Sequence, residues 1–141
     1  MNLKTRQIDF ENAFVQAELS EKERIFVTLP VGVHHSTHRN QDVALKLMKS
    51  LYGMKESPRL WYKKVTQGMI DIGFERSDHD QCMFMHKENK IIVLLYTDDC
   101  LLFCATNEQL QATIKTMKAI FSLTEQDVGN DVFNYLSLIH I

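Results

Sequence analysis

The chain has 141 residues, of which 45% are hydrophobic and 24% are charged, and its formal net charge is −2. This length allows one hydrophobic core, so one domain is the default, and the charge does not match a general nucleic-acid binder, which is normally strongly basic. The three cysteines lack zinc-type or disulfide-framework spacing, and no run approaches the ~18 apolar residues of a membrane-spanning helix, which argues against a disulfide scaffold, a zinc module and a membrane protein.

A lone acid, Asp9, stands near the end of the first predicted strand, Lys4–Phe10, and a predicted helix over Asn12–Leu19 follows. By itself this carboxylate is a helix N-cap or a solvated charge. Two further strands are predicted over Arg24–Leu29 and Val43–Met48.

A long helix is predicted over Pro58–Ile72. Ser57 suits the N-cap and Pro58 the first turn, and Gly73 is placed to end the helix. Apolar residues repeat at helical spacing along it and are expected in the core, where plain packing explains them. They are Leu60, Trp61, Val65, Met69 and Ile70.

Basic residues gather in and just before this helix. A local basic stripe is what a nucleic-acid backbone needs, because phosphate contacts supply most of the sequence-independent affinity. A solvated helix face is the other interpretation, and it stays open above all for Lys63 and Lys64. The basic residues are Lys46, Lys49, Lys55, Arg59, Lys63 and Lys64.

Two adjacent acids, Asp98 and Asp99, stand between two almost wholly apolar runs. The runs predict buried strands over Ile91–Tyr96 and Cys100–Cys104, and another strand is predicted over Cys82–His86. The polar break between the runs is so short that it predicts a hairpin turn with both acids at its tip. Such a pair is tolerated in a solvated turn, where Asp is common, or where a cation neutralises it.

The last predicted elements are a helix over Asn107–Phe121, with Asn107 as its N-cap, and a strand around Val132–Ile139. Strands and helices mixed with hairpins predict the α+β class.

The three acids together predict a more specific site than any one of them alone. Acids at the ends of two strands converge if the strands are neighbours in one sheet, which would bring Asp9 to Asp98 and Asp99. Carboxylates are hard oxygen ligands that suit Mg²⁺ or Mn²⁺. Two such ions about 3.5–4 Å apart are the arrangement that polymerases and nucleases use for phosphoryl transfer.

Four segments occur in the order found in reverse transcriptases of copia-type retrotransposons, a family that the chain resembles over most of its length. Residues 7–14 (QIDFENAF) resemble the family's opening palm motif, and residues 45–62 (LKLMKSLYGMKESPRLWY) resemble its K-S-L-Y-G-L-K-Q-A-P-R-x-W-Y signature. Residues 72–84 (IGFERSDHDQCMF) are similar to its G-F-x-x-S-x-x-D-x-C-x-F segment, and residues 95–99 (LYTDD) are similar to its Y-x-D-D box.

The resemblance implies catalytic roles for Asp9, Asp98 and Asp99, which would hold two Mg²⁺ or Mn²⁺ ions with the carbonyl of Phe10 as a further ligand. It also implies that Phe14 lies beneath the sugar of the incoming nucleotide and excludes a 2′-hydroxyl.

The same resemblance places Tyr52 and Gly53 against the incoming nucleotide, with Lys55 beside them. Glycine at that position fits a close approach of the backbone. Arg59 and Lys63 are expected to bind the nucleic acid.

The implied activity is that of an RNA-directed DNA polymerase, which joins deoxynucleoside triphosphates to a primer 3′-hydroxyl on an RNA or DNA template. The implied partners include the rest of a Pol polyprotein, with its integrase and ribonuclease H. The expected location is intracellular, in a cytoplasmic particle or the nucleus, and no membrane is expected among the partners.

The expected architecture is a palm-like antiparallel sheet backed by helices. It would form a single partial reverse transcriptase domain over residues 1–141, with incomplete fingers and thumb. The alternative is a catalytically inactive relic of such a domain, whose acids are only turn and cap residues.

Overall fold

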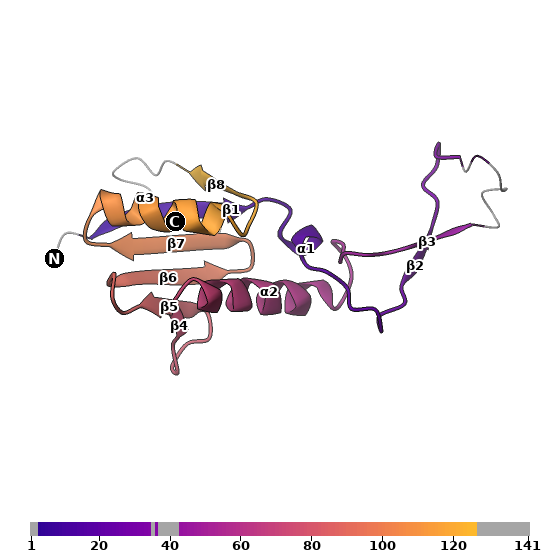
Figure 1. Ribbon diagram of the computed structural model, residues 1–141. Coiled ribbons are helices and arrows are strands. Elements are labelled where there is room, and N and C mark those ends of the chain that lie inside the picture. Colours follow the sequence, from indigo (N-terminus) through magenta and orange to yellow (C-terminus); the bar gives the residue numbers. More distant parts are fainter. Residues whose placement is uncertain (1–2, 35, 37–42, 127–141) are drawn as a thin grey trace, which may run out of the picture.

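The computed structural model of the chain describes residues 3–34, 36 and 43–126. Within them, six strands form one antiparallel sheet in the order β4-β5-β6-β7-β1-β8 (Figure 1). These strands are β1 (Lys4–Phe10), β4 (Glu75–Arg76), β5 (Met83–His86), β6 (Ile91–Tyr96), β7 (Asp99–Cys104) and β8 (Leu123–Gln126).

Two helices, α2 (Ser57–Asp71) and α3 (Asn107–Lys118), lie on one face of this sheet (Figure 1). Alternate strand residues point toward them and form the core, and burying each such large apolar side chain is worth about 1.5–3 kcal/mol. The core includes Ile8, Phe10, Phe84, Val93 and Leu102 from the strands, Trp61, Val65 and Met69 from α2, and Leu110, Ile114 and Met117 from α3. The predicted core position of Ile70 is wrong, because this residue lies on the outer side of α2 and is 47% exposed, and Leu60 is only partly buried.

The other face of the sheet carries the remaining alternate residues. In the paired strands β1 and β7, Ile8 lies opposite Cys100 in the core, so Asp9 and its partner Asp99 point to the face away from the helices. The strand pattern therefore places carboxylates on the face of the sheet that α2 and α3 leave uncovered.

A second, two-stranded sheet extends away from the main one (Figure 1). It pairs β2 (Phe26–Thr28) with β3 (Ala44–Lys46) and belongs to an arm that we define as residues 18–49. The short helix α1 (Ala13–Gln16) lies at its base.

The α+β class and the antiparallel sheet backed by helices are confirmed. Several predicted bounds are wrong, because the predicted strands over 24–29 and 43–48 shorten to β2 and β3, and the predicted helix over 12–19 shortens to α1. The strands β4 and β8 were not predicted. The helix expected to reach Phe121 ends at Lys118, and β8 follows it and pairs with β1. The strand predicted around Val132–Ile139 lies outside the described residues.

Both predicted helix N-caps are wrong by one residue. Ser57 is the first residue of α2, and its hydroxyl donates to the carbonyl of Leu51 (2.5 Å) instead of capping the helix. In α3 the cap is Thr106, whose hydroxyl accepts from the backbone N–H of Gln109 (3.3 Å), so Asn107 is already helical.

The predicted end of α2 is confirmed. Gly73 has φ +91°, which favours glycine, and its N–H donates to the carbonyl of Ile70 (2.9 Å). The N–H of Phe74 donates to the carbonyl of Met69 (3.0 Å), which completes a Schellman motif. Among the described residues, no helix has the length and apolar character needed to cross a membrane.

Candidate active site

The backbone positions of the three predicted acids lie at one end of the main sheet, but their side chains do not form the predicted three-carboxylate cluster within the described residues. Asp9, near the end of β1, is the direct register partner of Asp99, the first residue of β7. Asp98 precedes Asp99 in the turn that joins β6 to β7, and Tyr96 pairs with Asp99 across this hairpin. The turn is therefore shorter than predicted, since Asp99 already belongs to a strand.

The turn is fixed by two hydrogen bonds from other elements. The indole Nε1–H of Trp61 in α2 donates to the carbonyl of Thr97 (2.6 Å). The backbone N–H of Phe10 in β1 donates to the carbonyl of Asp98 (2.9 Å). Thr97 has φ +54°, a conformation that is unusual for a β-branched residue.

The electrostatics of the site agree with carboxylates that lie close together. Partial burial raises the pKa of Asp9 above its usual range, and repulsion from Asp98 and then from Asp99 raises it further. Glu11 makes a smaller contribution in the same direction, and its carboxylate accepts a hydrogen bond from the hydroxyl of Ser122 (2.7 Å). A cation near Asp9 would relieve this repulsion.

The donor set suits a hard divalent cation, because it consists of carboxylates and backbone carbonyls. Within the described part of the chain, no three His, Cys, Asp or Glu side chains are grouped tightly enough to hold an ion by themselves. Mg²⁺ does not require such a group, because it is usually held by one or two carboxylates together with substrate phosphates. The residues present therefore fit an ion that is bound together with its substrate.

The predicted nucleotide-binding residues Phe14 and Tyr52 also meet. Their ring centroids lie 4.7 Å apart at an interplanar angle of 50°. Gly53 follows Tyr52 with φ +89°, which explains why this loop needs glycine. A buried serine anchors the loop, because the hydroxyl of Ser50 donates to the carbonyl of Phe14 (2.5 Å).

A cavity of about 270 Å³ is lined by Phe14, by Pro58 and Trp61 of α2, and by Tyr96 and Thr97 of the β6–β7 hairpin. Phe14 therefore lies at the same end of the sheet as the carboxylates.

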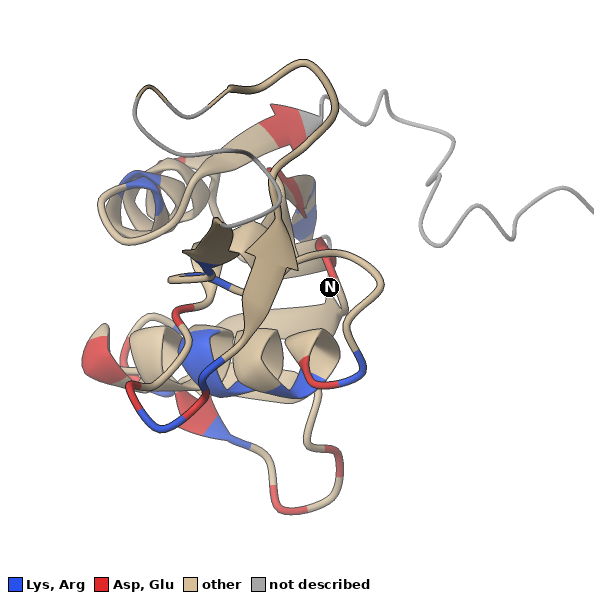
Figure 2. Cartoon of the chain, turned by 90° about the vertical axis from the view of Figure 1, so that its right-hand side faces the viewer, with Lys and Arg blue, Asp and Glu red and all other residues tan. Residues whose placement is uncertain are grey.

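The predicted basic residues are not joined to the carboxylates. Lys55, Arg59 and Lys63 are exposed, and within the described residues none of them makes a hydrogen bond or an ion pair that ties it to the carboxylates. Lys63 lines an open groove along α2, together with Gln67, on the helix-covered side of the sheet. Figure 2 shows basic and acidic segments interspersed on the side of the molecule that carries the arm.

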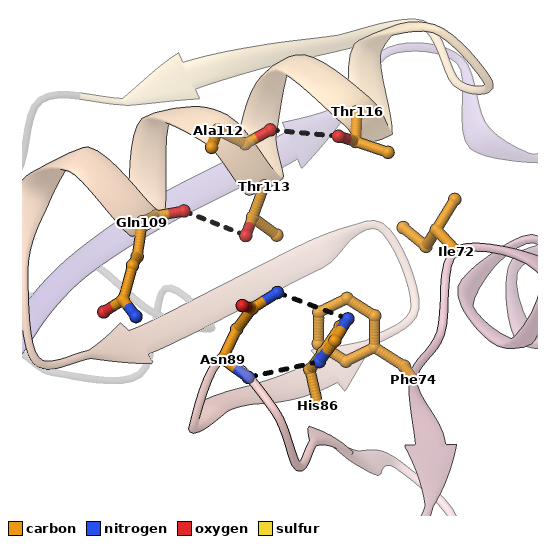
Figure 3. Close-up of a pocket in the computed structure, with 8 residues that line it drawn as sticks. All are labelled: Ile72, Phe74, His86, Asn89, Gln109, Ala112, Thr113 and Thr116. Atoms are coloured by element: carbon orange, nitrogen blue, oxygen red, sulfur yellow. Dashed lines mark hydrogen bonds between the residues drawn. The ribbon is translucent and has the colours of Figure 1, made fainter.

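A second cavity of about 140 Å³ lies between the end of α2, the β5–β6 turn and α3 (Figure 3). Asn89 donates its backbone N–H to Nδ1 of His86 (3.4 Å), and the His86 ring packs edge-on against Phe74 (5.2 Å between centroids). None of the predicted site residues lines this cavity.

Sequence reasoning missed three polar contacts that build the site. Trp61 was expected only to pack in the core, whereas its indole N–H binds the turn. Ser50 and Ser57 were not expected to anchor the loop between them, yet both are fully buried. The residue types alone gave a clue to these contacts, because a buried indole N–H or hydroxyl needs a hydrogen-bond partner.

Comparisons with known proteins agree on one family. A family model described as "Reverse transcriptase (RNA-dependent DNA polymerase)" matches residues 1–138. The chain is 32% identical over 124 residues to the retrovirus-related Pol polyprotein from transposon RE1 of Arabidopsis thaliana. It is 33% identical over 105 residues to that from transposon TNT 1-94 of Nicotiana tabacum, and 28% identical over 127 residues to the truncated transposon Ty1-A Gag-Pol polyprotein of Saccharomyces cerevisiae.

These matches cover 86%, 72% and 86% of this chain, respectively. They cover only 8%, 8% and 10% of the three relatives, so the chain spans a small part of the length of the polyproteins that it matches.

Proposed function

The chain belongs to the reverse transcriptase family of copia-type transposon Pol polyproteins, and we propose that it carries the catalytic centre of an RNA-directed DNA polymerase. The observation that supports this proposal most is the register that sets Asp9 opposite Asp99, next to the turn that holds Asp98. In this proposal residues 1–141 form a single partial domain, and the six-stranded sheet is its palm.

The carboxylates of Asp9 and Asp98 would be the direct ligands of two Mg²⁺ or Mn²⁺ ions, and Asp99 and the carbonyl of Phe10 would add oxygen ligands. When bound, the ions activate the attacking 3′-hydroxyl of a primer and stabilise the leaving oxygens. The chain's own contribution is to hold these oxygens on adjacent strands before substrate arrives. The raised pKa of Asp9, which burial causes first and the neighbouring carboxylates increase, supports this, because a bound cation would offset both effects.

The incoming deoxynucleoside triphosphate would lie between the carboxylates and the loop that holds Tyr52 and Gly53. The cavity that Phe14 shares with Thr97, the residue directly before Asp98, supports a place for Phe14 at this end of the sheet. Phe14, held against the Tyr52 ring, would exclude a 2′-hydroxyl from the sugar site. Lys55 would lie beside the nucleotide.

The nucleic acid would be an RNA or DNA template with its primer, and the exposed cations Arg59 and Lys63 of α2 would contact its phosphates. The position of Arg59 supports its proposed role, because Arg59 follows Pro58, which lines the cavity at the carboxylate end of the sheet. The names of the relatives support an assembly in which the remainder of a Pol polyprotein supplies further contacts.

The test is primer extension on an RNA template by a Pol polyprotein that carries this chain. Asp98→Asn should lower the Mg²⁺-dependent rate at least about a hundredfold, because it removes a charge that the metal ions need in the transition state. The matched control is Asp71→Asn, which removes an exposed aspartate at the C-terminal end of α2, about 15 Å along the helix from Trp61, and should leave the rate unchanged. Equal rates in the wild type and D98N would overturn the assignment, and no extension by the wild type would favour an inactive relic.

A further inference from the structure

The peptide groups on both sides of Asp98 are held by hydrogen bonds from two different elements. The carbonyl of Thr97 accepts from the indole of Trp61 in α2 (2.6 Å). The carbonyl of Asp98 accepts from the N–H of Phe10 in β1 (2.9 Å). Because each peptide group is planar, fixing both carbonyls fixes the direction in which the Asp98 side chain leaves the backbone.

The turn needs support because of its backbone conformation. Thr97 has φ +54°, and a β-branched residue in the left-handed region is strained. Such conformations persist only where the surroundings hold them, and they cluster at functional sites. The Trp61 hydrogen bond acts on the carbonyl of this strained residue.

Trp61 is itself held rigidly. Its side chain is 1% exposed, and its ring packs edge-on against Phe10 (5.1 Å between centroids) and Phe121 (6.0 Å). Phe10 therefore contacts Trp61 through its ring and Asp98 through its backbone N–H, which closes a circuit of contacts. Because Phe10 directly follows Asp9 in the chain, this circuit joins the backbones of Asp9 and Asp98.

We propose that Trp61 is a positioning residue, which sets the separation of the Asp9 and Asp98 carboxylates through its hydrogen bond to Thr97. This inference rests on the proposed function, because the separation matters for catalysis only if the two carboxylates hold the metal ions. A purely structural role would need only the apolar ring, whereas the positioning role needs the N–H.

The first test measures hydrogen exchange by NMR and needs neither metal nor activity. Trp61 is the only tryptophan, so the chain gives one indole N–H signal. In the wild type this proton should exchange at least about tenfold more slowly than that of free tryptophan, as a closed hydrogen bond requires. Exchange at the free rate would overturn the proposal without any variant.

The second test compares Trp61→Phe with Ile114→Ala, which also removes core packing but lies in α3 away from the turn. In W61F the amide of Phe10 should exchange about tenfold faster relative to global unfolding, and the Mn²⁺ concentration for half-saturation should rise about tenfold. I114A should change neither the relative exchange rate of the Phe10 amide nor the half-saturating Mn²⁺ concentration.

The outcomes separate the two proposals. An unchanged Phe10 amide in folded W61F overturns the positioning role, whether or not the wild type binds Mn²⁺. Faster exchange in W61F, together with a wild type that does not bind Mn²⁺ when nucleotide is present, supports the control of the turn by Trp61 and contradicts the proposed metal centre.

Discussion

At the scale of single residues, the contact between Phe14 and Tyr52 bears on the proposed role of Phe14 in excluding a 2′-hydroxyl. The two rings come from α1 and from the loop before α2, and they support each other at 4.7 Å between centroids. Phe14 is thereby held in the cavity that it shares with Thr97. If a nucleotide sugar binds there as proposed, a ring held in this way would leave no room for an additional hydroxyl.

Phe14→Ala should therefore raise ribonucleotide incorporation relative to deoxyribonucleotide incorporation by roughly tenfold or more, since one small group in a shaped pocket is worth about 1–3 kcal/mol of discrimination. The measurement is the ratio of kcat/KM for the two nucleotides in primer extension. Phe26→Ala, which removes an exposed ring of the arm, is the matched control and should keep the wild-type ratio. An identical ratio in F14A and the wild type would remove Phe14 from this role.

At the scale of elements, an ion pair joins the end of α3 to the edge strand β8. Nζ of Lys118 lies 2.7 Å from Oε1 of Glu125, and Gln111 donates to the other carboxylate oxygen (3.4 Å). The hydrogen bond from Lys118 is the main cause that lowers the pKa of Glu125, and it outweighs the opposing effect of burial. The pair lies at the surface, so its contribution to stability is small.

Glu125→Gln should lower the free energy of unfolding at pH 7 by less than about 1 kcal/mol. Because the carboxylate has a lower pKa in the folded chain than in the unfolded chain, its contribution is complete above the ordinary value of 4.5 and disappears as the pH falls through the lowered pKa. Urea unfolding of E125Q and the wild type at pH 7 and at successively lower pH measures this difference. A difference that grows toward low pH would contradict the ion pair as its source.

The elements that sequence reasoning predicted well are those with a strong local pattern. The strands over Lys4–Phe10 and Ile91–Tyr96 were predicted with the correct bounds, and the helix after Ser57 was predicted nearly so. Their apolar periodicity is continuous, and turn residues or glycine bound it. The edge strands β4 and β8 were missed because they are short and polar, and pairing with neighbouring strands defines them rather than local pattern.

The candidate site also contains one feature that the sequence predicted and others that depend on how distant elements pack. Sequence reasoning expected Asp9 to meet the doublet, and the register of β1 with β7 sets it opposite Asp99. The hydrogen bond from Trp61 to Thr97 was beyond sequence reasoning, because it joins two elements whose relative position only the packed core determines. The same reason explains the cavity that Phe14 shares with the hairpin.

At the scale of the whole molecule, the three cysteines report on whether the sheet and helices form one packed body. Cys100 and Cys104 are buried in the core, whereas Cys82 is exposed. Burial raises the pKa of the Cys100 thiol, and partial burial followed by repulsion from Asp80 raises that of Cys82. The reactive thiolate form is thus disfavoured at both sites.

Labelling of the folded chain with a thiol reagent at pH 8 should modify Cys82 first and should become faster as the pH rises. Cys100 and Cys104 should react only at the rate of global unfolding, because reagent cannot enter a close-packed core. Mass spectrometry of the labelled peptides distinguishes the three sites. Rapid and equal labelling of all three would indicate a chain without a stable core, as expected for a relic.

The base of the arm has a consequence for the evolution of this fold. The backbone N–H of Ser50 donates to the carbonyl of Ala17 (2.9 Å), and that of Leu19 donates to the carbonyl of Met48 (3.0 Å). The two ends of the arm are therefore hydrogen-bonded to each other. Lengthening a loop whose ends are already joined costs little, because closure entropy grows only slowly with length. Insertions or deletions in the arm can therefore change its length while Asp9, Asp98 and Asp99 keep their spacing. The arm, residues 18–49, is thus where proteins of this family can most easily come to differ in length.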